Sequence, residues 1–179
     1  MQKQFVIAIR VSNRFGVLTR VSAMFSRRGF NIDSLTVSPT ETDGVSRITV
    51  TMQGDDYARN QMIKQLSKLN EVLEICEMKS DSSVIREMAL VKIKCDSATR
   101  QDIITTANVF RANIIDYGTD SMVIIVTGES TKLDAFIKLM KPFEILEMCR
   151  TGAVALERGE DCLRHKDMEY INSLKINRE

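Results

Sequence analysis

The residues best suited to hold a ligand lie in the loop of residues 13–16, between two hydrophobic segments. Apolar residues alternate from Phe5 to Val11, which predicts a strand, and from Val17 they recur at helical spacing. The loop therefore leads into the first turn of a helix, where backbone N–H groups lack acceptors and the helix dipole adds partial positive charge. Gly16 has no Cβ and would let a carboxylate approach these groups, while Asn13 offers an amide and a carbonyl to a small zwitterion.

A structural alternative uses the same two residues. Gly16 would only permit a tight turn, and Asn13 would only cap the helix. A strand-Asn-x-x-Gly-helix pattern does not decide between the two by itself. The interpretation as a ligand site depends on the rest of the chain.

The other residues with chemical potential are scattered. Cys76, Cys95, Cys149 and Cys162 form no Cys-x-x-Cys pair, and the single histidine is His165. A zinc site, or a serine or cysteine nucleophile, would lack its usual partners. The first three cysteines lie in apolar segments and are predicted as reduced core residues, and His165 as a surface residue. We predict no catalytic residue and no metal site.

The composition excludes several further classes of protein. Of 179 residues 44% are hydrophobic, enough for a core, and the 25 basic and 24 acidic residues nearly cancel. The chain therefore has no net electrostatic field that would attract nucleic acid or a membrane surface. No apolar run approaches the roughly 20 residues needed to cross a bilayer, and the N-terminus does not resemble a signal peptide. We expect a cytoplasmic protein that binds neither nucleic acid nor membranes.

The periodicity predicts one order of elements twice. In the first half we expect a helix from Val17, a second helix capped by Asp55, and strands at residues 5–11, 31–37, 47–52 and 72–78. In the second half we expect helix faces at residues 103–110 and 133–140 and strands at residues 88–94, 113–117, 122–127 and 143–148. The fold class is α+β, with two tandem ferredoxin-like β-α-β-β-α-β domains that arose by duplication.

The expected domain boundaries follow from this order. An N-terminal domain spans residues 4–78, a polar linker residues 79–84, and a second domain residues 85–158. A charged tail covers residues 159–179, where Tyr170 to Leu174 can form a short amphipathic helix. Two helices on one face of a four-stranded sheet leave the other face and one edge uncovered, so we expect a homodimer.

The chain resembles the ACT domain and, more narrowly, the regulatory (small) subunits of acetolactate synthase, also called acetohydroxyacid synthase. The resemblance covers about residues 4–158. In the first half it rests on Asn13-x-x-Gly16-Val17-Leu18-x-Arg20-Val21, Arg28-Gly29-Phe30-Asn31-Ile32, and Ser46-Arg47-Ile48-Thr49. In the second half it rests on Arg86-Glu87-x-x-Leu90-Val91-Lys92-Ile93, Phe110-Arg111-x-x-Ile114-Ile115-Asp116, Lys132-Leu133-Asp134-Ala135-Phe136 and Arg150-Thr151-Gly152.

The resemblance implies a non-catalytic subunit that associates with a separate catalytic (large) subunit and raises its activity. Thiamine diphosphate, Mg and FAD would belong to that partner, and this chain would hold no cofactor. The family commonly confers feedback inhibition by valine, sometimes by leucine or isoleucine. A further hypothesis is that activation is separable from inhibition and involves Arg47 or the second domain; Arg47 as a solvated charge on the face of a strand is the structural alternative.

The resemblance also implies where the amino acid binds. Two sites would form at the homodimer interface, each from the loop of one chain and the second strand of the other. The implied ligand-binding residues are Asn13, Gly16, Val17 and Leu18 from one chain, with Asn31 and Ile32 from the partner. Asn31 as a simple turn residue is the structural alternative. The family usually has Glu before the Asn and a small residue or Pro before the Gly, where this chain has Ser12 and Phe15, and Phe15 could narrow or cover the pocket.

Two other functions share this order of elements. A stand-alone ACT-domain sensor of amino acids would regulate another enzyme or a transcription factor, but no helix-turn-helix segment flanks the two domains. An RNA-recognition motif would need exposed aromatic residues on its first and third strands. Residues 47–52 contain none. The regulatory-subunit interpretation therefore stands first.

Overall fold

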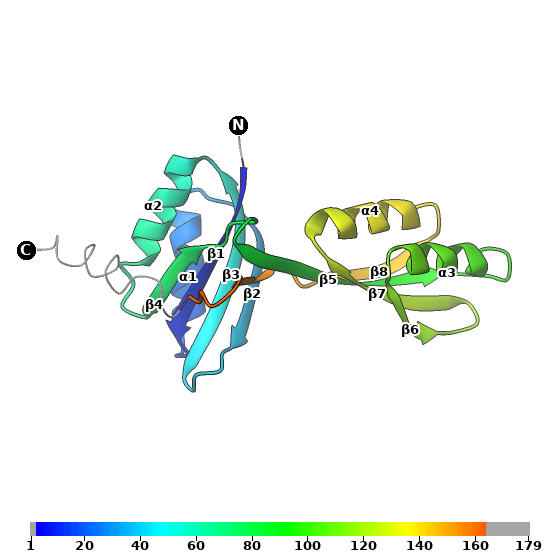
Figure 1. Cartoon of the computed structure of the whole chain (residues 1–179), viewed down its shortest axis with the longest axis horizontal. Coiled ribbons are helices and arrows are strands. Elements are labelled where there is room, and N and C mark those ends of the chain that lie inside the picture. Colours follow the sequence, from blue (N-terminus) through cyan, green and yellow to red (C-terminus); the bar gives the residue numbers. More distant parts are fainter. Residues whose placement is uncertain (1–2, 164–179) are drawn as a thin grey trace, which may run out of the picture. The chain divides into compact units, whose positions relative to one another are not determined.

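A computed structural model describes residues 3–163 of the chain (Figure 1). The predictions for His165 and for a helix at Tyr170 to Leu174 lie outside the described residues. Within them the chain forms two compact units. The first unit comprises residues up to Ile85 together with the segment from Ala153, and the second comprises Arg86–Gly152.

The first unit contains the predicted β-α-β-β-α-β order. Its elements are β1 (Lys3–Ser12), α1 (Val17–Arg27), β2 (Ile32–Pro39), β3 (Val45–Gly54), α2 (Asp56–Leu66) and β4 (Val72–Glu77). The strands form one antiparallel sheet in the order β2-β3-β1-β4. The side chain of Asp55 accepts the Ala58 N–H at 2.7 Å, so the predicted cap of α2 is confirmed.

Both helices of the first unit cover one face of its sheet (Figure 1). Ile7 and Ile9 of β1 point to this face and are fully buried against Val21 and Phe25 of α1 and Leu66 of α2. Burial of each large apolar side chain contributes about 1.5–3 kcal/mol. The alternation of β1 and the helical stripe of α1 therefore meet as the sequence predicts.

The opposite face of this sheet is covered, which corrects the expectation of an open face. A short strand, β9 (Val154–Glu157), pairs with β5. Ala153 and Ala155 pack with Ala8 of β1 and Met78 in a second, smaller core. Leu163 belongs to the same core. We call residues 153–163 the covering segment.

The second unit repeats the fold. Its elements are β5 (Ser83–Lys94), α3 (Arg100–Val109), β6 (Asn113–Tyr117), β7 (Ser121–Gly128), α4 (Ser130–Met140) and β8 (Ile145–Arg150). The sheet order β6-β7-β5-β8 matches that of the first unit. Val91 and Ile124 pack beneath Phe136 of α4, whose ring meets that of Phe110 edge to face at 5.4 Å. The two ferredoxin-like domains of the predicted fold class are confirmed.

The boundaries of the units differ from the expected domains. Strand β5 begins at Ser83, inside the expected linker 79–84, and residues 153–158 lie with the first unit. The physical reason is the covering segment, whose Ala153 and Ala155 are buried with Ala8 and Met78 in the smaller core of the first unit. No helix in the described part of the chain is long and apolar enough to span a membrane.

The covering segment yields a first prediction. Ala155→Asp would place a carboxylate against Ala8 and Met78, and burial of an unpaired charge costs several kcal/mol. We expect faster amide hydrogen exchange across residues 153–158 and a free energy of unfolding lower by about 2 kcal/mol or more. Val154→Asp is the matched control, because the Val154 side chain is exposed. Equal exchange in the two variants would contradict the packing described.

Candidate ligand-binding site

The N-terminus of α1 has no side-chain cap. Gly16 occupies the N-cap position with φ 81° and ψ −4°, a left-handed conformation that glycine adopts at no steric cost. A Cβ at Gly16 would meet only the Arg20 Nη2 atom, 3.9 Å away, so the space in front of the glycine is open within the protomer. We call residues 13–16 the α1 loop.

Two backbone donors remain available at this helix end. The Val17 N–H donates to the Arg14 carbonyl at 3.3 Å, and the Arg20 N–H donates to the Gly16 carbonyl at 3.0 Å. Among the described residues no acceptor binds the N–H groups of Leu18 and Thr19. Sequence reasoning named Val17 and Leu18 and did not name Thr19, although the general rule that the first helical N–H groups lack partners applies to it.

Asn13 does not act as the helix cap. Its backbone N–H donates to the Gly44 carbonyl at 2.7 Å, which fixes the start of the loop, and its side chain is exposed. No side chain caps α1. The structural alternative for Asn13 therefore does not describe this chain, and its amide is free to contact a ligand.

The charges around the α1 loop leave this end positive. No acidic residue stands in the first turn of α1. The nearby Arg20 side chain pairs with Glu71 at 2.9 Å. Unpaired backbone N–H groups and the helix dipole together favour a bound carboxylate.

Phe15 lies at the tip of the α1 loop and is fully exposed. Its ring therefore does not plug the space in front of Gly16 within the protomer. The expectation that Phe15 narrows or covers the pocket is therefore not met within one protomer.

The protomer does not bring all six predicted binding residues together. Ile32, at the start of β2, lies in register with Phe5 across β3, whereas Pro39, at the end of β2, lies in register with Val11 beside the α1 loop. Asn31, which precedes β2, is exposed. These two residues are thus at the far end of the sheet from the α1 loop, and one chain alone offers only half of the predicted site.

The described residues contain no group of three or more His, Cys, Asp or Glu that could hold a metal ion. The outcomes for the three predicted core cysteines differ: Cys95 is buried as predicted, Cys76 is half-buried, and Cys149 is exposed. Cys149 pairs with Leu90 on the sheet face that α3 and α4 do not cover, which explains its exposure. The candidate site near α1 has backbone donors suited to a carboxylate.

The chain has two tandem ferredoxin-like units, and the first contains a helix that starts at a glycine and is open to a ligand at that end. These features define an ACT-type regulatory protein. Family models agree: residues 7–74 match the AHAS small subunit-like ACT domain, and residues 86–159 match the small subunit of acetolactate synthase. The chain belongs to the family of acetolactate synthase small subunits.

Individual relatives support this assignment. The chain is 48% identical to a probable acetolactate synthase small subunit of Archaeoglobus fulgidus over 153 residues, which is 86% of this chain and 96% of that protein. It is 44% identical to the acetolactate synthase small subunit of Bacillus subtilis over 86% of this chain and 90% of the relative. The crystal structure of the small subunit from Thermotoga maritima is 37% identical and superposes with a TM-score of 0.83 over 89% of this chain and 99% of that one.

The uncapped helix end gives a second prediction, on stability. Asn13→Ala removes no hydrogen bond from the described fold, so the free energy of unfolding should change by less than about 0.5 kcal/mol. Asp55→Ala is the reference variant, because it removes a true cap and should cost about 1 kcal/mol. Urea unfolding of both variants measures the difference. A cost for Asn13→Ala as large as that for Asp55→Ala would restore the capping role.

Proposed function

We propose that this chain is the regulatory subunit of acetolactate synthase in branched-chain amino-acid biosynthesis, without a catalytic site of its own. It associates with the catalytic subunit, raises its activity and makes it sensitive to feedback by valine, leucine or isoleucine. Thiamine diphosphate, Mg and FAD belong to the catalytic subunit, and the holoenzyme acts in the cytoplasm. Family membership supports the partner, and the α1 loop supports the ligand.

The observation that carries the proposal is the pair of free N–H groups at the start of α1. The ligand carboxylate would accept from Leu18 and Thr19, while the Asn13 amide would contact its polar end. Hydrogen bonds to a charged group contribute about 1.5–3 kcal/mol each before the costs of binding. Burial of a branched aliphatic side chain adds about 1.5–3 kcal/mol, and after the costs of binding we expect a Kd of roughly 0.01–1 mM.

A homodimer would complete the site through the edge strand β2. This strand is outermost in the sheet order, and Val37 near its end is exposed. If two copies of β2 pair antiparallel about a twofold axis, the start of the partner's strand lies beside Pro39, at the end of the sheet that carries the α1 loop. The partner's Asn31 and Ile32 would then face the ligand.

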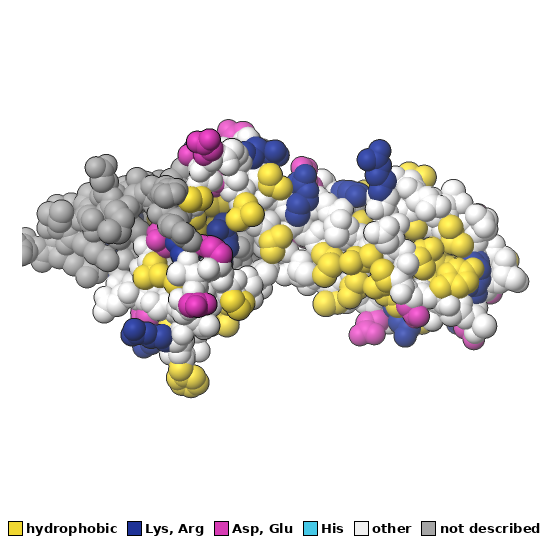
Figure 2. Space-filling view, turned by 60° about the horizontal axis from the view of Figure 1, so that its bottom comes forward, with side chains coloured by type: hydrophobic (Ala, Val, Ile, Leu, Met, Phe, Trp, Pro, Cys, Tyr) yellow, Lys and Arg dark blue, Asp and Glu magenta, His cyan; other side chains and the backbone are white. Residues whose placement is uncertain are grey.

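The second unit offers a surface for the catalytic subunit. Figure 2 shows hydrophobic side chains gathered on this unit. Leu90 of β5 and Val123 and Ile125 of β7 alternate with buried residues and so lie on the face that α3 and α4 leave uncovered. An apolar sheet face of this kind is suited to a protein partner. Ligand binding at the dimer would then act on the catalytic subunit with a coupling of about 1–3 kcal/mol, an ordinary value for allostery.

A third prediction separates the effect of a side chain's charge at position 16 from the effect of its size. Asp and Asn have nearly the same size, and both tolerate a positive φ better than other side chains. Gly16→Asp places a carboxylate where the ligand's own carboxylate would lie, so inhibition should need at least about tenfold more valine, leucine or isoleucine. Gly16→Asn should weaken inhibition less, and both variants should still activate the catalytic subunit.

The measurement is the rate of acetolactate formation by the catalytic subunit mixed with each variant, over a titration of the three amino acids. Activation without amino acid serves as the internal control for folding and assembly. If Gly16→Asp responds to the amino acids as the wild type does, the proposed site is incorrect.

A further inference from the structure

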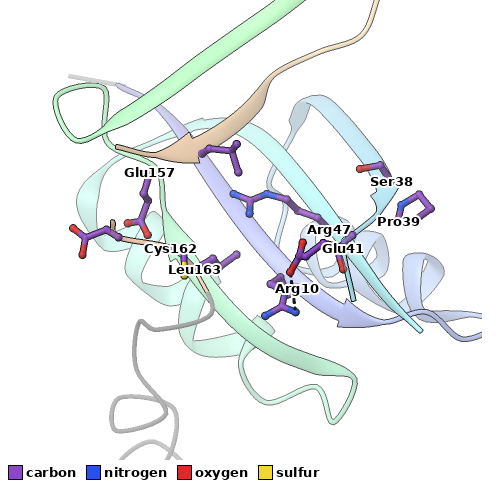
Figure 3. Close-up of a pocket in the computed structure, with 11 residues that line it drawn as sticks. Arg10, Ser38, Pro39, Glu41, Arg47, Glu157, Cys162 and Leu163 are labelled. Atoms are coloured by element: carbon purple, nitrogen blue, oxygen red, sulfur yellow. Dashed lines mark ion pairs between the residues drawn. The ribbon is translucent and has the colours of Figure 1, made fainter. Parts of the chain in front are cut away.

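A cavity of about 510 Å³ lies on the face of the first sheet opposite α1 and α2 (Figure 3). Its floor is formed by Arg10 of β1 and Arg47 of β3, which are direct cross-strand neighbours. The hairpin between β2 and β3 forms one wall, and the covering segment forms the other. Its volume is typical of small-molecule sites.

Arg10 is a buried cation in this floor. It is 6% exposed, and its guanidinium pairs with Glu74 at 3.3 Å and donates to the Thr42 Oγ1 at 3.2 Å. Glu41 lies 3.9 Å away. The Nε–H of Arg10 is buried, and no acceptor among the described residues reaches it. Buried donors of charged groups are rarely left without an acceptor.

The positive charge of Arg47 is less well compensated than that of Arg10. Its Nη2 donates to the Ala155 carbonyl at 2.6 Å, but no carboxylate of the described residues lies within 4.0 Å of it, and its buried Nε–H also lacks an acceptor. Burial lowers the pKa of the Arg47 guanidinium, Glu157 only partly opposes this, and Arg10 lowers the pKa further. A cation in this situation gains from a bound anion.

The remaining walls limit the class of ligand. Pro39, Leu156 and Leu163 line the cavity with apolar surface, and Glu157 and Asp161 add carboxylates. A simple anion would be repelled by these carboxylates. A molecule with a carboxylate, an ammonium group and an apolar side chain would match the arginines, the acids and the apolar residues that line the cavity.

We propose that this cavity is a second binding site for a free aliphatic amino acid. Arg47, supported by Arg10, holds the carboxylate, Asp161 faces the ammonium group, and Leu156 and Leu163 contact the side chain. The site lies within one chain and on the opposite face of the sheet from α1. It therefore does not depend on the dimer site described under the proposed function.

The site also touches the covering segment, which gives the ligand a way to act on the fold. The bond from Arg47 to the Ala155 carbonyl fastens this segment to the sheet. A ligand that binds both Arg47 and Asp161 bridges the sheet and the segment. Bound ligand should therefore slow amide exchange across residues 153–158.

Calorimetric titration of the Gly16→Asp chain tests the proposal with the dimer site disabled. The probes are L-leucine, 4-methylpentanoate, which lacks the ammonium group, and 3-methylbutylamine, which lacks the carboxylate. We expect leucine to bind one site per chain, 4-methylpentanoate to bind more weakly, and the amine not to bind. No heat from leucine at concentrations up to tens of millimolar would overturn the proposal.

Two added substitutions separate binding from structure. Arg47→Gln should weaken leucine at least about tenfold, and Arg47→Lys should weaken it less. Asp161 is exposed, so Asp161→Asn leaves the fold intact; it should weaken leucine about threefold or more and leave 4-methylpentanoate unchanged.

Hydrogen exchange across residues 153–158 in each variant reports whether the covering segment stays in place. Leucine binding that neither Arg47→Gln nor Asp161→Asn alters would overturn the proposal. The same holds if Asp161→Asn weakens both probes equally. Neither result would bear on the Gly16→Asp inhibition experiment, which reports on the other site.

Discussion

Backbone N–H groups at the start of a helix need acceptors, and in this chain those of Leu18 and Thr19 have none among the described residues. The cause is local, since Gly16 turns left-handed at the N-cap position and supplies no side chain to cap the helix. The strand β1 and the bond from the Asn13 N–H to Gly44 hold the α1 loop in place. The sheet thus presents these donors to solvent, where a bound carboxylate would replace water as their acceptor.

Because of the strand arrangement in the first sheet, the proposed site needs two chains. Its register puts the start of β2 at the end remote from the α1 loop, so Asn31 and Ile32 can only approach that loop from another protomer. The covering segment already occupies the face opposite the helices. Of the two edge strands, β2 and β4, β2 is the one that carries Ile32, so pairing through the outer edge of β2 would bring the two halves of the site together, and a ligand there would respond to how the two chains are held.

Local patterns predicted most of this architecture. The alternation that buries Ile7 and Ile9, the cap at Asp55 and the glycine at position 16 are all short-range features that a sequence displays directly. Strand β9 was not predicted, because it is only four residues long and Ala153 and Ala155, which bury it, are small and pack on a strand far away in sequence. The sequence also does not show which backbone N–H groups find an acceptor. In the structure the Arg14 carbonyl accepts from the Val17 N–H, whereas the Thr19 N–H has no acceptor among the described residues. Arg10 did carry a signal, a charge within an otherwise apolar strand.

Subunit complementation tests the central claim, that each amino-acid site is built from two chains. One chain carries Gly16→Asp, which disables the α1 loop, and the other carries Asn31→Ala, which disables the strand side. Each variant alone should lose valine binding at the dimer interface, which equilibrium dialysis measures as the difference in capacity between the wild type and the variant. After unfolding and refolding together, random pairing should restore about a quarter of this difference, because each mixed dimer has one interface site with both halves intact. No restoration in a mixture shown to contain mixed dimers would contradict the account.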